Sequence, residues 1–276
     1  MKTAFRRLVR FKTSNGDIRY GEAQEQVKIG DKVKLYTGTE PWNLNPSDDE
    51  AVIAEILCPL ASTPIFYGIG LNYKGHIAEA SLDVPAFPTV FTKPSGALAG
   101  PYGDIHVDPA CQFLDYEGEL AFVVGKDVKN YNAKDDFEEF LLGYTVSNDV
   151  SSRYWQFPER SGGQHGYAKS FDQFGPIGPV IVSTSEIPGI PHLDLKTTVN
   201  GEERQNSNTN DLLFTIPQIL DHLSRGTTLK KGTVVMTGTP SGVAAFMKPP
   251  KWLKTGDVVE VEISQIGKIK NKMVIE

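Results

Sequence analysis

The stretch of residues 114–125, LDYEGELAFVVG, constrains the fold of this chain more than any other. Five apolar residues, 120–124, run up to Gly125 and predict a buried strand. Glu117 and Glu119 stand at the mouth of this strand, and residues two apart on a strand face the same way. Two carboxylates at the edge of an apolar interior repel each other and lack water. A shared proton, a Lys or Arg side chain, or a metal ion must therefore lie between them.

A third carboxylate favours the metal ion among these choices. Asp149 follows another apolar run, residues 141–146, at a Ser-Asn-Asp turn. Three carboxylates at the ends of two strands form the hard oxygen site that Mg²⁺, Mn²⁺ or Ca²⁺ prefers, and no Cys or His lies close enough in sequence to suggest zinc. The alternative is that Glu117 and Glu119 mark an exposed strand edge and that Asp149 only forms a turn.

Composition excludes several classes of partner. A net charge of −6 and a pI near 5.5 argue against a nucleic-acid or anionic membrane surface, so we expect small-molecule partners. No segment approaches the roughly 18 apolar residues of a membrane span. The two cysteines, Cys58 and Cys111, are too few for a disulfide framework and indicate a reducing compartment. We expect a cytoplasmic protein, with a mitochondrial location as the alternative because the first residues are basic.

Turn signals near the start of the chain predict a small β-rich N-terminal domain. Asn15-Gly16 between two apolar runs is a strong hairpin signal. We place the domain boundary near residues 61–64, so that residues 1–62 form this domain and residues 63–276 a larger one.

The larger part reads mostly as strands joined by turns, with a hairpin at Asn200-Gly201. Residues 153–167 are polar and contain glycine, which predicts a loop able to line a pocket. The expected fold class is therefore α+β, built mainly on antiparallel sheet. Helical spacing of apolar residues predicts helices in three segments: residues 47–58, residues 134–142 led by Asn132, and residues 214–224.

A possible acid–base pair lies in residues 71–80. If this segment is helical, His76 and Glu79 share one face of the helix, because they are three residues apart. A carboxylate held against an imidazole keeps the ring oriented and raises its basicity. The alternative is an ordinary surface pair.

Six motifs together resemble the fumarylacetoacetate hydrolase superfamily, over most of the chain from Ile65 onward. They are, in chain order, GLNYKGHIAEA, DYEGELAFVVG, GYTVSNDVSSR, KSFDQFGPIGPV, VNGEERQ and TGTPSGV. The resemblance implies a mixed β-roll catalytic domain, a small N-terminal domain and a homodimer. It also implies one divalent cation, commonly Mg²⁺ or Mn²⁺ and sometimes Ca²⁺.

The resemblance assigns roles to individual residues. The metal ligands of the family match Glu117, Glu119 and Asp149, and the catalytic histidine matches His76, paired with Glu79. The remaining matches are Lys169, which stabilises negative charge on the substrate, Arg153 and Gln156, which orient substrate oxygens, and Tyr73 and Thr239 in substrate-contacting segments.

Two departures from the family pattern leave the substrate open. True fumarylacetoacetases carry Asp-Tyr, with a fourth acidic ligand, where this chain has Asn72-Tyr73. Many members have Asp after the arginine, where this chain has Tyr154-Trp155.

The expected function is that of a divalent-metal-dependent hydrolase or lyase acting on a 2-oxo or 1,3-diketo carboxylic acid. Carbon–carbon cleavage or decarboxylation would pass through a metal-stabilised enolate, with Lys169 beside it and His76 as the general base. Residues 73–88 would form a lid. One alternative is an isomerase, tautomerase or hydratase of 2-hydroxymuconate-type or oxaloacetate-type acids, and another is a non-catalytic binding protein that retains the fold.

Overall fold

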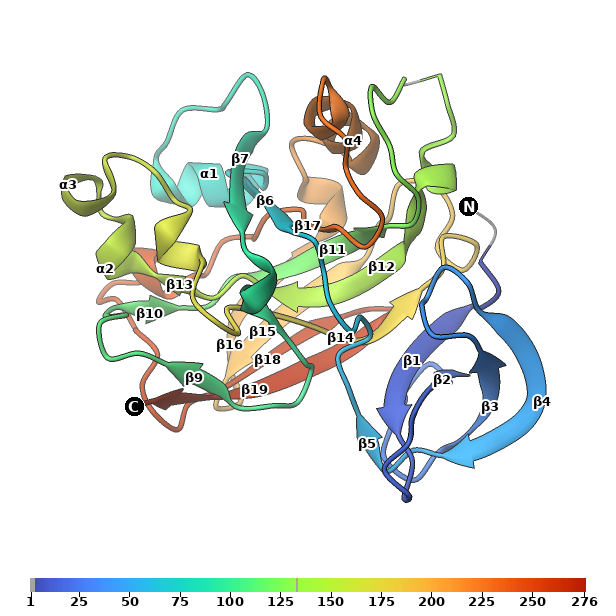
Figure 1. Cartoon of the computed structure of the whole chain (residues 1–276). Coiled ribbons are helices and arrows are strands. Elements are labelled where there is room, and N and C mark those ends of the chain that lie inside the picture. The colour runs from blue at the N-terminus through green and yellow to red at the C-terminus, as the bar shows by residue number, and fades with distance from the viewer. Residues whose placement is uncertain (1–2, 133) are drawn as a thin grey trace.

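The chain folds into two large β-sheets with short helices along one side, the α+β class that the sequence predicts (Figure 1). This computed structural model describes residues 3–132 and 134–276. The strands are, in chain order, β1 (Arg7–Lys12), β2 (Ile18–Glu22), β3 (Lys32–Thr37), β4 (Asn45–Val52), β5 (Glu55–Ile56), β6 (Phe66–Gly70), β7 (Thr89–Lys93), β8 (Leu98–Ala99), β9 (Ile105–Val107), β10 (Leu114–Asp115), β11 (Gly118–Val124), β12 (Leu141–Asn148), β13 (Ser151–Ser152), β14 (Gly175–Val182), β15 (Asp194–Val199), β16 (Glu202–Asn208), β17 (Val234–Met236), β18 (Val258–Ile263) and β19 (Gly267–Ile275). The α-helices are α1 (Lys74–Ala80), α2 (Arg153–Gln156), α3 (Pro158–Ser161) and α4 (Ile216–Ser224).

The larger sheet has twelve strands and is mixed. Its main path runs β4-β3-β2-β1-β14-β12-β11-β17-β6-β7, with β5 paired to β1 and β8 paired to β14. The pairs β17–β6 and β14–β8 are parallel, whereas β11 is antiparallel to both of its neighbours, β12 and β17. This agrees with the expectation of a mainly antiparallel mixed sheet.

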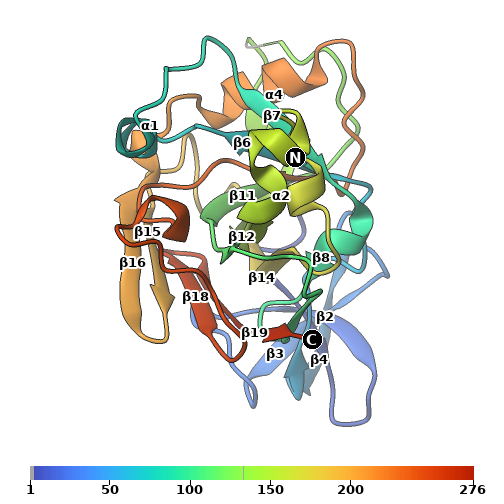
Figure 2. The same cartoon turned by 90° about the vertical axis from the view of Figure 1, so that its left-hand side faces the viewer.

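The smaller sheet, β16-β15-β18-β19-β9, packs against the middle of the larger one (Figure 2). The main hydrophobic core takes Leu120, Phe122 and Val124 from β11, while Ala121 and Val123 belong to a second core. Strand β11 is therefore buried on both faces, as its continuous apolar run predicts.

The N-terminal strands continue the larger sheet. Strand β1 pairs with β14, so that Leu8 lies opposite Ile181, and both residues belong to the second core. The hairpin predicted at Asn15-Gly16 joins β1 to β2 and is confirmed. The two parts of the chain thus share a sheet and a core, and the division at residues 1–62 and 63–276 stays a prediction.

The helix expected over residues 47–58 is wrong, because this segment forms β4 and β5. Strand β4 pairs with β3, and β5 pairs with β1, so both find backbone partners in a sheet. Ile53 and Ile56 are buried, whereas residues 48–50 are exposed along β4. Pairing with distant strands outweighs the helical spacing of four apolar residues.

The helix expected over residues 134–142 shortens to a single 3₁₀ turn, η2 (Phe137–Phe140). The expected cap, Asn132, accepts a hydrogen bond from the Lys134 backbone at 3.0 Å, but Asp136 caps the turn itself. The last part of the expected helix belongs to β12, where Leu141 pairs with Val124. Sheet pairing again decides the outcome.

The other expectations of helix and loop fare better. Helix α4 confirms the segment 214–224, and α1 lies within residues 71–80. Residues 153–167 contain two short helices, α2 and α3, rather than loop alone. Within the described residues, every helix is too short or too polar to cross a lipid bilayer.

Candidate metal and proton-transfer site

Three carboxylates meet where β11 and β12 end side by side. The antiparallel register places Gly118 opposite Asn148, so Glu117 and Glu119 on one strand come next to Asp149 after the other. One oxygen from each carboxylate lies within 4.8 Å of the others. The backbone N–H of Asp149 donates to the Glu117 carbonyl at 2.8 Å, which holds the two strand ends together. The alternative of an exposed strand edge is wrong, because these three residues are at most 7% exposed.

The glycine between the two glutamates is required by close packing. Gly118 faces the smaller sheet, and a Cβ there would collide with the Thr197 hydroxyl and lie 3.1 Å from Gln205 Oε1. Its N–H donates to the same Gln205 oxygen at 3.0 Å. The alternation of the strand therefore sends the carboxylates one way and the bare glycine the other.

Two of the three carboxylates have buried cationic partners. Lys169 Nζ lies 2.9 Å from Glu117 Oε2 and 2.5 Å from Asp149 Oδ2, and it also donates to Ser151 at 2.7 Å. Arg153 Nη2 lies 2.7 Å from Glu117 Oε1, and Lys93 forms an ion pair with Asp149. The possibility that Lys or Arg separates the carboxylates is thus realised for Glu117 and Asp149.

These ion pairs keep Glu117 and Lys169 charged. Burial would raise the pKa of Glu117, but Lys169 and Arg153 hold it below its usual value. Burial would likewise lower the pKa of Lys169, but Asp149 and Glu117 raise it. The pair therefore enters the apolar interior in ionised form.

Glu119 lacks such a partner. Its Oε2 accepts a hydrogen bond from the Gly238 backbone at 2.6 Å, and no described residue donates to its Oε1. Burial, Asp149 and Glu117 together raise the pKa of Glu119 well above its usual value. Gly238 has φ +108°, a left-handed conformation that favours glycine, so the chain turns sharply to bring this N–H to the carboxylate.

The arrangement fits a hard divalent cation. With Glu119 ionised, the buried carboxylates of Asp115, Glu117, Glu119 and Asp149 outnumber the cationic side chains Lys93, Lys169 and Arg153 by four to three, even when Lys93, whose pKa burial lowers, is counted as charged. The donor atoms that converge are all carboxylate oxygens, the ligands preferred by Mg²⁺, Mn²⁺ and Ca²⁺.

Tyr73 also faces this cluster. Its side chain is fully buried, its hydroxyl has no hydrogen-bond partner among the described residues, and burial and the charge of Glu119 raise its pKa. A buried hydroxyl without a partner is costly unless a ligand supplies one.

The His76–Glu79 pair forms on helix α1, as the spacing predicts. His76 Nδ1 lies 3.1 Å from Glu79 Oε2, and His76 is only 7% exposed. Glu79 Oε1 accepts a second hydrogen bond, from the Gly242 backbone at 3.1 Å. The His76 ring also packs edge-on against Phe246, with ring centroids 5.5 Å apart. The contact at Nδ1 leaves Nε2 as the ring nitrogen that can exchange a proton with a ligand.

The remaining predicted residues fall into two groups. Arg153 Nη1 donates to Gln156 Oε1 at 2.7 Å, so these two residues adjoin the acidic cluster together. The Thr239 hydroxyl instead donates to the Gly118 carbonyl at 3.0 Å and accepts from Gln205 at 2.8 Å. Both interactions of that hydroxyl are with protein groups, and substrate contact by Thr239 stays a prediction.

Sequence reasoning missed Lys93 and Asp115. Lys93 is 1% exposed and shares the inward face of β7 with Phe91, a period-two signal that could have revealed it. Asp115 is fully buried and has the same parity as Glu117 and Glu119, so the alternation that identified the glutamates extends one step further back.

The departure at Asn72 has a structural explanation. Asn72 Nδ2 donates to the Thr237 carbonyl at 2.7 Å and to the Phe214 carbonyl at 3.1 Å, and its Oδ1 accepts from the Phe214 backbone at 2.7 Å. An ionised Asp could not make the two donations. Asn72 therefore ties two chain segments together beside the site and does not stand in for a metal ligand.

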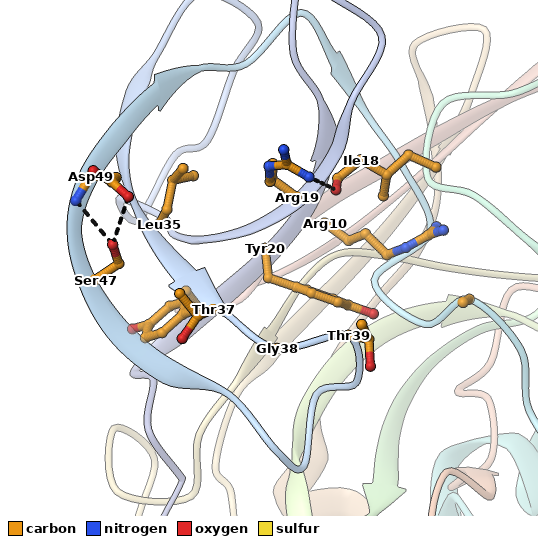
Figure 3. Close-up of a pocket in the computed structure, with 12 residues that line it drawn as sticks. Arg10, Ile18, Arg19, Tyr20, Leu35, Thr37, Gly38, Thr39, Ser47 and Asp49 are labelled. Carbon is orange, nitrogen blue, oxygen red and sulfur yellow. Dashed lines mark hydrogen bonds between the residues drawn. The ribbon is translucent and has the colours of Figure 1, made fainter.

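A cavity of about 540 Å³ opens elsewhere, on the N-terminal strands (Figure 3). Arg10, Arg19 and Tyr20 line it together with Asp49. Arg19 is ion-paired with Asp17 at 3.1 Å, and none of the lining residues belongs to the acidic cluster. The cavity is thus separate from the chemistry of Glu117, Glu119 and Asp149.

Comparisons with known proteins agree with the motifs. The family model "Fumarylacetoacetate (FAA) hydrolase C-terminal" matches residues 65–274. The chain is 40% identical over 219 residues to the "Oxaloacetate tautomerase fahd2, mitochondrial" of Xenopus laevis. The aligned region covers 79% of this chain and 68% of that protein.

Among solved structures, the 5-carboxymethyl-2-hydroxymuconate delta-isomerase of Mycobacterium smegmatis is similar, with a TM-score of 0.83, 32% identity and coverage of 98% of this chain and 100% of that one. The 2-hydroxyhepta-2,4-diene-1,7-dioate isomerase of Mycobacterium marinum has a TM-score of 0.82 and 28% identity over 98% of both chains. The expected β-roll fold is confirmed by these neighbours.

Proposed function

Because the chain belongs to the fumarylacetoacetate hydrolase family, we propose that it is a divalent-metal-dependent tautomerase of an oxaloacetate-like 2-oxo acid. The names of its relatives support this choice, since a tautomerase and two isomerases all move a proton next to an oxygen-bearing carbon. The proposed reaction interconverts the enol and keto forms of the acid. It takes up the tautomerase alternative stated from the sequence.

One observation carries the proposal, namely a buried cluster with an uncompensated carboxylate, Glu119, near an oriented imidazole, His76. Glu117, Glu119 and Asp149 would hold the cation, which we propose is Mg²⁺, with Mn²⁺ and Ca²⁺ as the alternatives for the same oxygen ligands. When bound, the cation supplies positive charge that stabilises an enolate oxygen.

The chain's own cations would bind and orient the acid. Arg153 Nη2 lies near Glu117 but has no aligned hydrogen-bond acceptor among the described residues, so it can donate to a substrate carboxylate. The Tyr73 hydroxyl is free in the same sense. Lys169, held in its charged form, places a second positive group in the cluster.

His76 would move the proton. Its Nε2 accepts a proton from the carbon beside the keto group. The electron pair of the broken C–H bond is delocalised onto the keto oxygen, which gives the enolate. Glu79, in contact with Nδ1, stabilises the imidazolium that results. Transfer of that proton from His76 to the enolate oxygen gives the enol. In the reverse direction the enol O–H loses its proton to His76 and the carbon receives it, so the reaction needs no further reactant.

Hydrolytic carbon–carbon cleavage and decarboxylation stay predictions from the sequence. Cleavage would additionally need a water molecule activated by His76, whereas decarboxylation needs only enolate stabilisation. The homodimer and the cytoplasmic location also stay predictions, and the Xenopus relative carries the word mitochondrial in its name.

A direct assay separates these reactions. The enol form of oxaloacetate has its own ultraviolet absorbance, so its decay with and without Mg²⁺-loaded protein measures ketonisation. Pyruvate release from oxaloacetate and cleavage of acylpyruvates are followed in parallel. We expect accelerated ketonisation that is lost on chelation and restored by Mg²⁺. Acylpyruvate cleavage without ketonisation would instead identify a hydrolase, and an inert metal-loaded protein would identify a binding protein.

A further inference from the structure

Asp115, in β10 (Leu114–Asp115), is a fully buried carboxylate that the proposed chemistry does not use. Its Oδ2 accepts from Arg153 Nε at 2.8 Å and from the Ala245 backbone at 3.1 Å. Its Oδ1 accepts from the backbones of Tyr116 and Ala244, at 2.9 Å and 2.8 Å. Four protein donors satisfy this carboxylate, so it is not a spare metal ligand.

Two of these donors belong to residues 242–246, which we call the support loop. The loop touches helix α1 at both ends, because the Gly242 N–H donates to Glu79 and the Phe246 ring packs against His76. The Tyr116 hydroxyl donates to the Gly242 carbonyl at 2.9 Å and anchors the loop a second time. Residues 115 and 116 thus bind the support loop through hydrogen bonds, and the same loop contacts α1.

Helix α1 needs this support. It has seven residues, and its N-cap, Tyr73, makes no side-chain capping bond. An isolated helix of this length is unstable in water, so tertiary contacts must hold it in place. One contact of α1 is independent of the support loop: the Gly75 N–H donates to the Asp211 carboxylate at 2.9 Å. The contacts of Glu79 and His76 are with the support loop.

We propose that Asp115 is a positioning residue that sets the distance between the substrate-orienting arginine and the base. One carboxylate holds the Arg153 guanidinium on one side and, through the support loop, the His76–Glu79 pair on the other. A shift of the Arg153 guanidinium or of the support loop changes the position of His76 relative to a substrate bound at Arg153. The inference rests on the proposed function insofar as His76 is the base and Arg153 binds substrate.

Asp115→Asn tests the proposal with an isosteric change. The amide nitrogen cannot accept hydrogen bonds, so two of the four donors lose their acceptor, and Arg153 loses a charge partner. Tyr116→Phe is the second variant, because it removes only the hydroxyl bond to Gly242 and leaves Arg153 untouched. Asp257→Asn is the matched control. Asp257 accepts from the Lys254 backbone and from Asn200, both at 2.8 Å, and none of these residues belongs to the site.

The first readout is hydrogen–deuterium exchange without substrate, followed peptide by peptide. In Asp115→Asn we expect exchange about tenfold faster in the support loop and in α1 together, with β18 and β19 unchanged. Tyr116→Phe should give a smaller increase in the same two segments, and Asp257→Asn an increase only around its own turn. Faster exchange in the loop with α1 unchanged would overturn the proposal. So would a uniform increase over the whole sheet, because Asp115 would then serve general stability.

The second readout is the split between KM and kcat, with kcat calculated per metal-binding site. Tyr116→Phe loosens only the loop, so kcat should fall several-fold while KM is unchanged. Asp115→Asn disturbs both the Arg153 guanidinium and the support loop, so kcat should fall about tenfold or more and KM should rise. Unchanged constants in both variants would overturn the proposal. If the wild type has no activity, the proposed function fails, and the exchange experiment still decides whether Asp115 supports α1.

Discussion

The acidic cluster and the His76–Glu79 pair lie in the same site but are built in opposite ways. The carboxylates of Glu117, Glu119 and Asp149 stand at the ends of paired strands, where the register of β11 and β12 fixes them. The proposed base, His76, stands on α1, a seven-residue helix held by a few bonds to loops. The carboxylate charges are thus held by the rigid sheet, whereas the group proposed to move the proton lies on a segment with few anchors.

The two regions also differ in electrostatic balance. Glu119 has no cationic partner, so burial and its acidic neighbours raise its pKa, and its ionised form costs free energy unless a cation binds. His76 already has its partner in Glu79. Metal should therefore act mainly on the strand ends, and variants of α1 should leave metal binding intact.

Glu119→Gln should give the largest effect. The neutral amide removes the uncompensated carboxylate, so Mg²⁺ binding should be lost and turnover should fall by about 10³-fold or more. Isothermal titration with Mg²⁺ and the ketonisation assay measure the two losses. Glu203→Gln, an exposed residue paired with Lys196, is the control and should change neither. Retained metal binding in Glu119→Gln would show that the carboxylate of Glu119 is not required to hold the cation.

His76→Ala should give the next largest effect. Without the base, kcat should fall by about 10²-fold or more while Mg²⁺ affinity stays that of the wild type. The same titration and assay serve here, with His106→Ala at an exposed position as the control. Loss of metal binding together with activity would show that the two regions are not separate.

Lys93→Met tests the framework under the strand ends. Lys93 is buried against Asp149 and the Phe174 carbonyl. Its removal leaves Asp149 with Lys169 as its cationic partner, so the free energy of unfolding should fall by about 1–3 kcal/mol. Lys126→Met removes an exposed pair with Glu139 and should cost about 0–1 kcal/mol. Urea denaturation of the metal-free proteins measures both. Equal stability of Lys93→Met and wild type would mean that Lys169 alone balances Asp149.

The smallest effect is a pH dependence of the metal-free protein. Because the pKa of Glu119 is raised in the folded state, its contribution to stability is present below the unfolded pKa of about 4.3 and is lost as pH rises through the folded value. The amide of Glu119→Gln does not titrate. The difference in free energy of unfolding between the two proteins should therefore move against wild type as pH rises, by up to about 1.4 kcal/mol per pH unit. Denaturation in a chelator at several pH values measures this difference, and a difference independent of pH would show that Glu119 is balanced without metal.

Local patterns predicted the acidic site well, because its geometry follows from strand alternation. Glu117 and Glu119 face the same way by parity, and the apolar runs behind them and before Asp149 predicted two buried strands. The His76–Glu79 contact followed from helical spacing in the same way. Each of these inferences needs only residues close together in the chain.

Predictions from local patterns failed where strands or side chains pair with residues far away in the chain. The segment of residues 47–58 has helical spacing, but β3 and β1 offer it sheet partners. Asp115 has the parity of the two glutamates, but its partners Arg153 and Ala244 lie far along the chain. No local pattern shows which distant residues form hydrogen bonds with residues 47–58 or with Asp115.

By itself, the sequence determined which side chains could form a cation site and which could serve as a base, because burial and periodicity are local properties of the chain. Only the tertiary structure decided how the charges are balanced. Asp149 and Glu117 are paired with Lys93, Lys169 and Arg153, which come from distant segments, and Glu119 is left without a cationic partner. Electrostatic balance depends on distances across the fold, and those distances are set when the sheets pack together.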